Sequence, residues 1–135
     1  SLGTLLGILG HSDEAIANQE IAIRSNPLDP SIFFRFSGLA LAHYMAGRFE
    51  TAIEWAERAT HRMPRWYFAH FVLVASYEAL DRQEDAANAV KYCQDIFPEI
   101  SINDLDRVPL KDSGKLNELR ARLIKAGFSK QPMVH

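Results

Sequence analysis

Five histidines, one cysteine and several adjacent carboxylates are the side chains in this sequence that could do chemistry. The histidines are His11, His43, His61, His70 and His135. A zinc site needs ligands a few residues apart on one helix face, and no two of these histidines have that spacing. Glu84 and Asp85 could act as a general acid and base, but the dipole of a helix that starts there explains both carboxylates better. No neighbour in the sequence is placed to lower the pKa of Cys93, so we expect a packed thiol there rather than a nucleophile.

Motifs that carry enzyme chemistry are absent from the sequence. It contains no glycine-rich phosphate loop, nucleophile elbow, HExxH segment or calcium-loop spacing. We therefore expect no catalytic, cofactor-binding or metal-binding residues, and a packing role for His43 and His70. The chain is not expected to be an enzyme, although it could be a fragment of one whose catalytic domain lies outside it.

The composition is typical of one globular domain with its own core. The chain has 135 residues, 47% of them apolar, and a net charge of −2. This charge argues against nucleic acid as a partner, and no apolar run is long enough to span a membrane. A single cysteine fits a reducing compartment, so we expect a cytoplasmic protein. The opening SLGTLLGILG lacks the basic leader of a signal peptide and an initiator Met, which suggests a longer parent protein.

One pattern of small residues and prolines occurs three times. A small residue is followed by a second one seven positions later and by a proline five positions after that; the positions are Ala15, Ala22 and Pro27, then Ala52, Ala59 and Pro64, then Ala86, Cys93 and Pro98. Small residues seven apart lie on one helix face and let another helix approach closely. Proline cannot continue a helix. Each copy therefore predicts a helix that packs through its small residues and ends before its proline.

Another helix precedes each of these helices, so that each repeat consists of a first and a second helix. Gly10, Gly47 and Asp81 share one position between the two, where a left-handed residue would cap the first helix. Acidic residues follow at the start of the second helix, where its dipole favours negative charge; they are Asp13, Glu14, Glu50, Glu84 and Asp85. A basic run lies at the end of one such helix, where cations are stabilised; it is Arg58, His61, Arg62 and Arg65. Asp29 and Pro30 predict an N-cap and a first helical residue that lengthen the next helix.

These positions make the chain resemble the tetratricopeptide repeats, whose 34-residue unit is a pair of antiparallel helices. The resemblance implies an all-α fold, a right-handed solenoid of helical hairpins with three repeats in residues 1–98 and two C-terminal capping helices in 101–128. The unit boundaries are 1–29 (truncated), 30–66 and 67–100, and 129–135 would be a flexible tail. More narrowly, GLALAHYMAGRFETAIEWAERA and VPLKD…KLNELRARLIKAGF are similar to the C-terminal repeat region of bacterial class III adenylate and guanylate cyclases.

The C-terminal segment predicts two further helices. SIND at 101–104 resembles a capping box before a short helix that Pro109 would end. Leu116, Leu119, Leu123 and Ile124 are expected on one apolar stripe of the last helix, which Gly127 would stop. Such helices are suited to cover the exposed core at the end of a repeat array.

The resemblance also implies a concave groove lined by the first helix of each unit. Its lining would include Phe34, Ser37, Gly38, Leu41, Tyr44 and Met45, then Phe68, Phe71, Val72, Ala75, Glu78 and Ala79. The candidate protein-binding residues are Phe34, Leu41, Tyr44, Met45, Phe68, Phe71 and Glu78. The groove lacks the Lys, Arg and Asn residues of a carboxylate clamp, so the expected ligand is an apolar peptide or helix, or a second copy of the chain. Alternatively, several of these aromatic residues are core or are covered by the terminal helices.

Two functions follow from this resemblance. The first is a non-catalytic protein–protein interaction module. The alternative is a regulatory C-terminal region of a multidomain enzyme such as a class III adenylate cyclase. The sequence preceding Ser1 in the parent protein would discriminate between them.

Overall fold

The computed structural model describes residues 13–107 and 113–129, and every regular element in them is a helix. The elements are α2 (Asp13–Ser25), α3 (Ile32–Met45), α4 (Phe49–Arg62), α5 (Tyr67–Ala79), α6 (Gln83–Ile96), the 3₁₀-helix η1 (Ile102–Arg107) and α7 (Ser113–Ala126). The all-α prediction is confirmed for this part of the chain. The helix expected in the first ten residues lies outside it.

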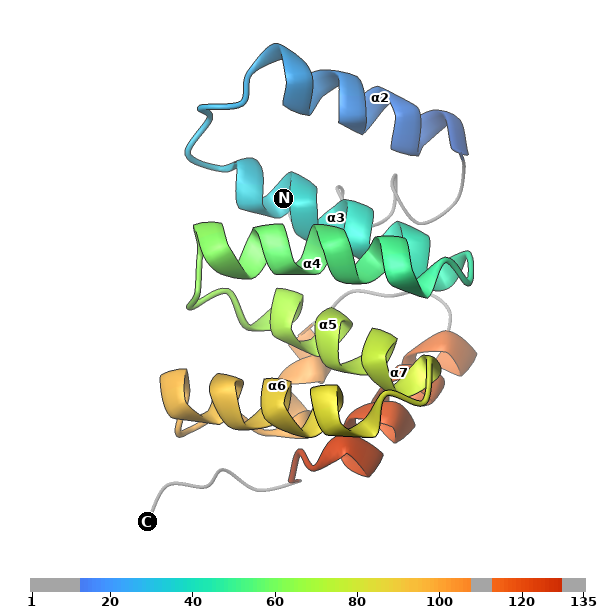
Figure 1. Cartoon of the computed structure of the whole chain (residues 1–135), viewed down its shortest axis with the longest axis vertical. Coiled ribbons are helices and arrows are strands. Elements are labelled where there is room, and N and C mark those ends of the chain that lie inside the picture. Colours follow the sequence, from blue (N-terminus) through green and yellow to red (C-terminus); the bar gives the residue numbers. More distant parts are fainter. Residues whose placement is uncertain (1–12, 108–112, 130–135) are drawn as a thin grey trace.

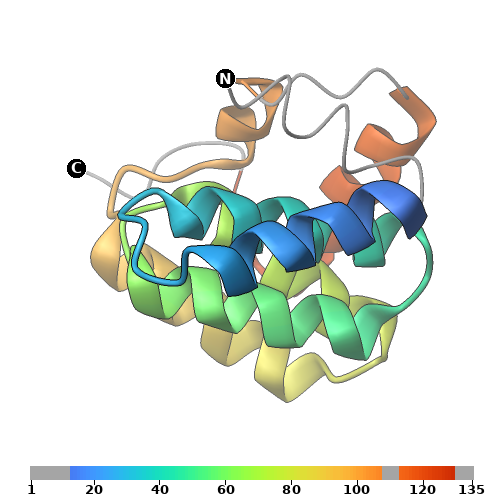
Figure 2. The same ribbon diagram turned by 90° about the horizontal axis from the view of Figure 1, so that it is seen from above.

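Successive helices from α2 to α6 run in opposite directions and are stacked along the long axis (Figure 1). Seen from above, α4 and α6 lie on one side of α3 and α5, while η1 and α7 lie on the other (Figure 2). Helix α7 contacts α5, α6 and η1. We call the side of α3 and α5 that carries Phe34, Leu41, Tyr44, Met45, Phe68, Phe71 and Glu78 the inner face.

The geometry of α3–α4 recurs in α5–α6, 34 positions further along the chain. Helices α4 and α6 are 14 residues each and have equivalent bounds. Gly47 and Asp81 have positive φ values of 83° and 59°, so the prediction of left-handed caps is confirmed at both turns. The backbone N–H of the next residue, Arg48 or Arg82, donates to a carbonyl five residues back at 2.9 Å in each turn.

The small residues of α4 and α6 lie in the core, whereas Ala22, the equivalent residue of α2, is only partly buried. Ala52, Ala59, Ala86 and Cys93 are fully buried, as their spacing predicts. Helices α4 and α6 end two residues before Pro64 and Pro98 respectively, which confirms the predicted stops.

A continuous core joins α3 to α7, and a smaller one lies under α2. The larger core includes the fully buried Phe68 and Phe71 together with Leu119 and Leu123 of α7. The smaller core is formed where Ile16 and Ile23 of α2 pack with residues of α3, α4 and α5; those residues are Ile32, Phe36, Leu39, Ala42, Ala59 and Ala69. Among the described residues, fewer apolar side chains therefore hold the end of the stack at α2.

Two details differ from the sequence-based expectation. Helix α3 begins at Ile32 rather than at Pro30, because the Asp29 carboxylate accepts hydrogen bonds from the Ser31 N–H and hydroxyl, both at 2.9 Å, and holds a turn before the helix. Ile124 is 40% exposed and does not belong to the apolar stripe of α7. The stripe continues instead from Leu123 to Phe128, which is buried beyond the end of the helix.

Both C-terminal elements begin as expected, whereas Pro109, predicted to end the first one, and the predicted tail from residue 130 onward lie outside the described residues. Ser101 and Asp104 form the predicted capping box, with the Ser101 N–H donating to Asp104 at 3.0 Å and Ser101 Oγ accepting from the Asn103 N–H at 3.3 Å. The element they start is a 3₁₀-helix. Gly127 ends α7 with a φ of 126°. The carbonyl of Ser129 then accepts a hydrogen bond from Ile102 at 2.9 Å and fastens the end of α7 to η1.

Candidate functional site

The inner face holds helix α7. Of the seven residues assigned to a binding groove, Leu41, Tyr44, Phe68, Phe71 and Glu78 are buried, whereas Phe34 and Met45 are partly exposed. Three of the buried ones, Tyr44, Phe71 and Glu78, contact side chains of α7 or of the segment that follows it. The sequence left open that terminal helices cover these residues, and this arrangement is the one found.

Arg122 fixes the middle of α7 to the inner face. Its Nη1 donates a hydrogen bond of 2.6 Å to the hydroxyl of Tyr44. The guanidinium carbon also lies 5.4 Å from the ring centroid of Tyr44 and 5.3 Å from that of Phe49. Glu118 pairs with the same guanidinium at 2.8 Å, one turn back on α7. Burial raises the pKa of Tyr44, so the arginine donates to a lone pair of a neutral hydroxyl.

Glu78 supplies the negative charge of the inner face. Its side chain is only 3% exposed, and its Oε2 accepts no hydrogen bond from the described residues. Lys125 of α7 places its Nζ 3.7 Å from this oxygen, which is an ion pair but too long for a hydrogen bond. The lysine side chain is itself 61% exposed. Lys125 therefore compensates the charge of the Glu78 carboxylate, but no described residue donates a hydrogen bond to its Oε2.

Apolar contacts complete the docking of the C-terminal segment. The ring of Phe128 meets the ring of Phe71 edge to face, with centroids 5.2 Å apart. Leu119 and Leu123 are buried in the same core. The sequence analysis does not identify Arg122, Lys125 and Phe128 as binding residues. It predicts only that the LRARLIKAGF segment, which contains them, is part of a capping helix.

A second group of aromatic rings lies at the start of α3 and α5. Trp66 lies 4.9 Å from Phe34, 6.0 Å from Phe33 and 5.4 Å from Tyr67, measured between ring centroids. All four side chains are partly exposed. The indole N–H of Trp66 donates to Ser37 at 3.0 Å and so fixes the ring across both helices. Only Phe34 of this group was predicted; the others are adjacent to helix starts, where the repeat pattern does not indicate which way a side chain points.

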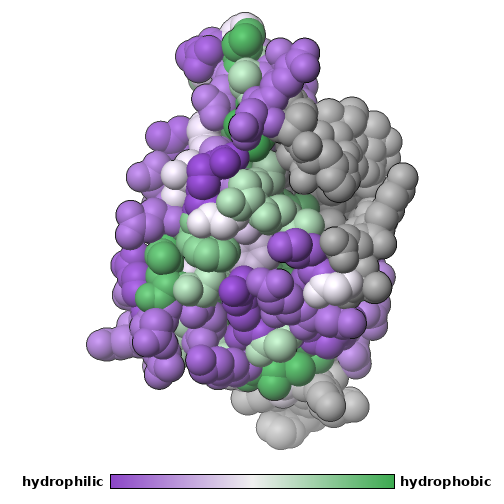
Figure 3. All heavy atoms as spheres, turned by 90° about the vertical axis from the view of Figure 1, so that its right-hand side faces the viewer, coloured by the Kyte–Doolittle hydropathy of each residue, from purple (hydrophilic) through white to green (hydrophobic). Residues whose placement is uncertain are grey.

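On the opposite side, α4, α5 and α6 form a shallow groove of about 330 Å³, which we call the outer groove. Its lining includes Glu57, His61, Tyr77, Asp85 and Tyr92. The Tyr77 hydroxyl donates to Glu57 at 3.2 Å. Burial, followed by the charge of Glu57, raises the pKa of Tyr77. The outer groove is open, and polar and apolar side chains line it alike. On the side seen in Figure 3, too, apolar areas are interrupted by hydrophilic side chains.

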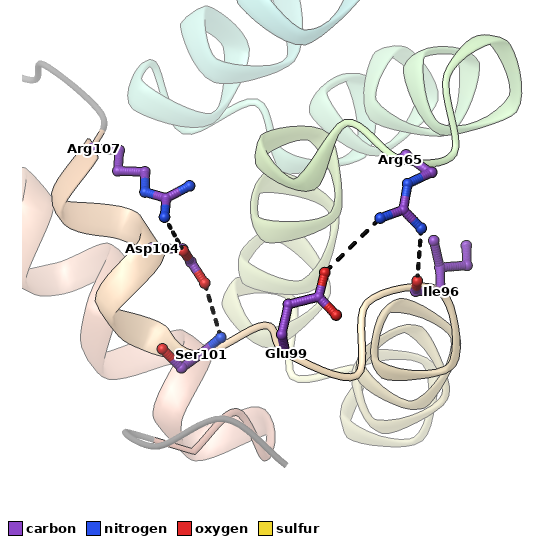
Figure 4. Close-up of polar contacts among 6 residues, drawn as sticks. All are labelled: Arg65, Ile96, Glu99, Ser101, Asp104 and Arg107. Carbon is purple, nitrogen blue, oxygen red and sulfur yellow. Dashed lines mark hydrogen bonds and ion pairs between the residues drawn. The ribbon is translucent and has the colours of Figure 1, made fainter. Parts of the chain in front are cut away.

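The basic run at the end of α4 has structural contacts. Arg65 donates to the carbonyl of Ile96 at 3.1 Å and pairs with Glu99 at 3.8 Å (Figure 4). Its guanidinium also lies over the ring of Phe97. It therefore caps the C-terminus of α6. Arg58 lies over the ring of Trp55, with its guanidinium carbon 4.6 Å from the centroid.

The buried histidines are held in packing positions, as predicted. His70 Nε2 lies 2.7 Å from the carbonyl of Pro64, and burial lowers the pKa of His70. His43 Nδ1 accepts from Arg48 at 2.9 Å, and Arg48 pairs with Asp13 at 3.3 Å. Burial, then the charge of Arg48, lowers the pKa of His43.

Cys93 is a buried thiol, and the acidic residues form no metal-binding cluster in the described part of the chain. Burial raises the pKa of Cys93 to about 12, so the thiol stays protonated at neutral pH. No cluster of three or more His, Cys, Asp or Glu side chains in residues 13–107 and 113–129 could hold a metal ion. Within the same residues, no helix has the length and apolar character needed to cross a bilayer.

Comparison of the chain with family models, curated proteins and solved structures gives no match. The class that the described residues define is therefore an all-helical domain whose inner face carries one of its own helices.

Proposed function

We propose that this chain is a tetratricopeptide-repeat module that binds an apolar or amphipathic helix of a protein partner on its inner face. It has no catalytic role in this proposal. The groove residues are those named from the sequence, with Arg122, Lys125 and Phe128 of the C-terminal segment as their present occupants.

The recurrence of backbone geometry supports the repeat assignment. Met63 and Phe97 donate to the carbonyls of Ala59 and Cys93 at 2.9 and 2.8 Å, at equivalent positions after α4 and α6. Trp66 and Ile100 then close equivalent turns, both at 3.0 Å. Hydrogen bonds that recur at the repeat length are what a tandem array of helical hairpins requires.

The observation that carries the proposed activity is the position of α7. An amphipathic helix lies across the inner face and meets it through buried leucines, a charge pair and a partly buried hydrogen bond, and Phe128 adds an aromatic contact after the helix ends. These are the contacts by which helix-in-groove complexes form. A surface that holds one helix of this kind has the shape and chemistry to hold another.

Selection of displayed peptides tests this function. A library of amphipathic helical peptides is selected against the full chain, and binders are measured against two variants. Phe34→Ala removes a partly exposed ring of the inner face and should weaken binding at least about fivefold, equivalent to roughly 1 kcal/mol. Tyr92→Ala removes a ring of similar size from the outer groove and should leave affinity unchanged. Binders that respond to Tyr92→Ala and not to Phe34→Ala, or a selection that yields no binder, would refute the proposal.

A further inference from the structure

We infer that the inner face selects a basic helix: the partner is an amphipathic helix of another protein that takes the place of α7 and presents Lys or Arg to Glu78. This inference rests on the proposed function and specifies the chemistry of its ligand.

Glu78 determines the charge of the ligand. Its side chain is 3% exposed, so water cannot solvate the carboxylate well. A buried carboxylate without a compensating cation is strongly unfavourable. A helix with an acidic or neutral residue at this point would leave that cost in place, whereas a Lys or Arg removes it.

Helix α7 shows the register that such a ligand needs. Arg122 and Lys125 are three residues apart and therefore lie on one side of the helix. Arg122 contacts Tyr44 and Lys125 faces Glu78. The buried positions Leu119 and Leu123 flank the arginine, and Phe128 follows after the helix ends. The matching ligand has the pattern Leu-x-x-Arg-Leu-x-Lys, followed by an aromatic residue.

The contact with Glu78 is one that a ligand could improve. Lys125 lies 3.7 Å from Oε2, and this oxygen accepts no hydrogen bond from the described residues. A ligand cation that donates directly to Oε2 would make an interaction that α7 lacks. Charge-assisted hydrogen bonds of this kind are stronger than an ion pair at longer range.

The probe for this inference is a fluorescent synthetic peptide of residues 113–129, and the readout is its anisotropy on binding to the full chain. The receptor carries Arg122→Ala, which loosens the chain's own α7 by removing the bond to Tyr44 without opening a core cavity. Leu119→Ala serves as a second loosened receptor. Circular dichroism and thermal melting confirm that each receptor is folded. The peptide should bind a loosened receptor at least about tenfold more tightly than the wild-type chain.

The charge of the ligand is then varied in a double-mutant cycle. A peptide with Lys125→Gln should bind the loosened receptor at least about tenfold more weakly than the unchanged peptide. With Glu78→Gln in the receptor, the two peptides should differ by less than about twofold. Equal binding of both peptides to the receptor that retains Glu78 would overturn the inference and leave the proposed function standing.

Two other outcomes count against these proposals. If neither loosened receptor binds the peptide at any concentration tested, the inner face is not an exchangeable helix site and the proposed function fails with it. If a loosened chain sediments as a dimer and the peptide dissociates that dimer, the occupant is α7 of a second copy. The assignment to a different protein is then wrong.

Discussion

The inner face and the outer groove are built from the same helical hairpins, yet one is covered by a helix while the other is open to solvent. The difference begins in the helices. Ten residues are buried in α3 and ten in α5, against five in α4 and three in α6. A helix that is apolar all round must be covered on both sides. Helices α3 and α5 therefore need α4 and α6 on one side and a further helix on the other, whereas α4 and α6 can face water.

The largest expected difference between the two faces concerns Phe71 and Tyr92. Phe71→Ala should lower the free energy of unfolding by about 3–5 kcal/mol, because it removes a fully buried ring and leaves a cavity under Phe128. Tyr92→Ala removes a ring that is 50% exposed and should cost less than about 1 kcal/mol. Urea denaturation of both variants measures this. Similar losses in the two would mean that α7 does not cover the inner face in solution.

A smaller but still large effect is expected at the seam between the two faces. Ala86 is fully buried and its neighbour Ala87 is exposed on the same helix. Ala86→Glu should destabilise the chain by roughly 2 kcal/mol or more through a buried charge and overpacking, while Ala87→Glu should change stability by less than about 0.5 kcal/mol. Thermal melting compares them. An unchanged melting temperature for Ala86→Glu would show that the proposed helix register is wrong.

The turn at Gly47 provides a reference that belongs to neither face. Gly47 has a φ of 83°, and a Cβ built there would have no atom within 4 Å. Gly47→Ala should therefore cost about 1 kcal/mol, from backbone strain alone. Gly47 lies close to Tyr44 and Phe49, which contact Arg122, but a Cβ at Gly47 meets none of their atoms, so peptide affinity should stay unchanged. Ala46→Gly, at the adjacent exposed position, is the matched control for backbone flexibility.

The smallest expected effect is a dependence of stability on pH. The pKa values of His43 and His70 are lowered in the folded chain, so below the ordinary value of about 6.5 the unfolded chain binds more protons than the folded one. Stability should thus be complete above pH 6.5 and fall as the pH is lowered from there towards the folded pKa values. Melting temperatures between pH 7.5 and 5.5 test this, with His43→Gln expected to flatten the curve. A melting temperature that rises on acidification would contradict it.

Sequence reasoning succeeded where the determinants are local. Gly47, Asp81 and Pro64 constrain their own backbone, and the alanines of α4 and α6 are spaced by helix geometry. It could not place α7, because an apolar stripe shows that a helix is covered without showing by what. Phe71 is buried and Phe34 is partly exposed because of where α7 packs. The repeat pattern alone does not distinguish the two residues. The exposure of Ile124 was missed for a similar reason, because the apolar stripe does not show that Leu123 and Phe128 are the side chains buried in the contact.

The bond between Arg122 and Tyr44 has a consequence for how the chain folds. It joins residues that are 78 positions apart, whereas most contacts among α2 to α6 are between helices that follow one another in the sequence. An array held by neighbouring contacts alone can fray from either end, one hairpin at a time. The long-range bond closes such an array into a single cooperative unit at the entropic expense of forming a large loop. We therefore expect α7 to open as one sub-global step of unfolding, and amide hydrogens of the helices beneath it to exchange through that step before the whole domain unfolds.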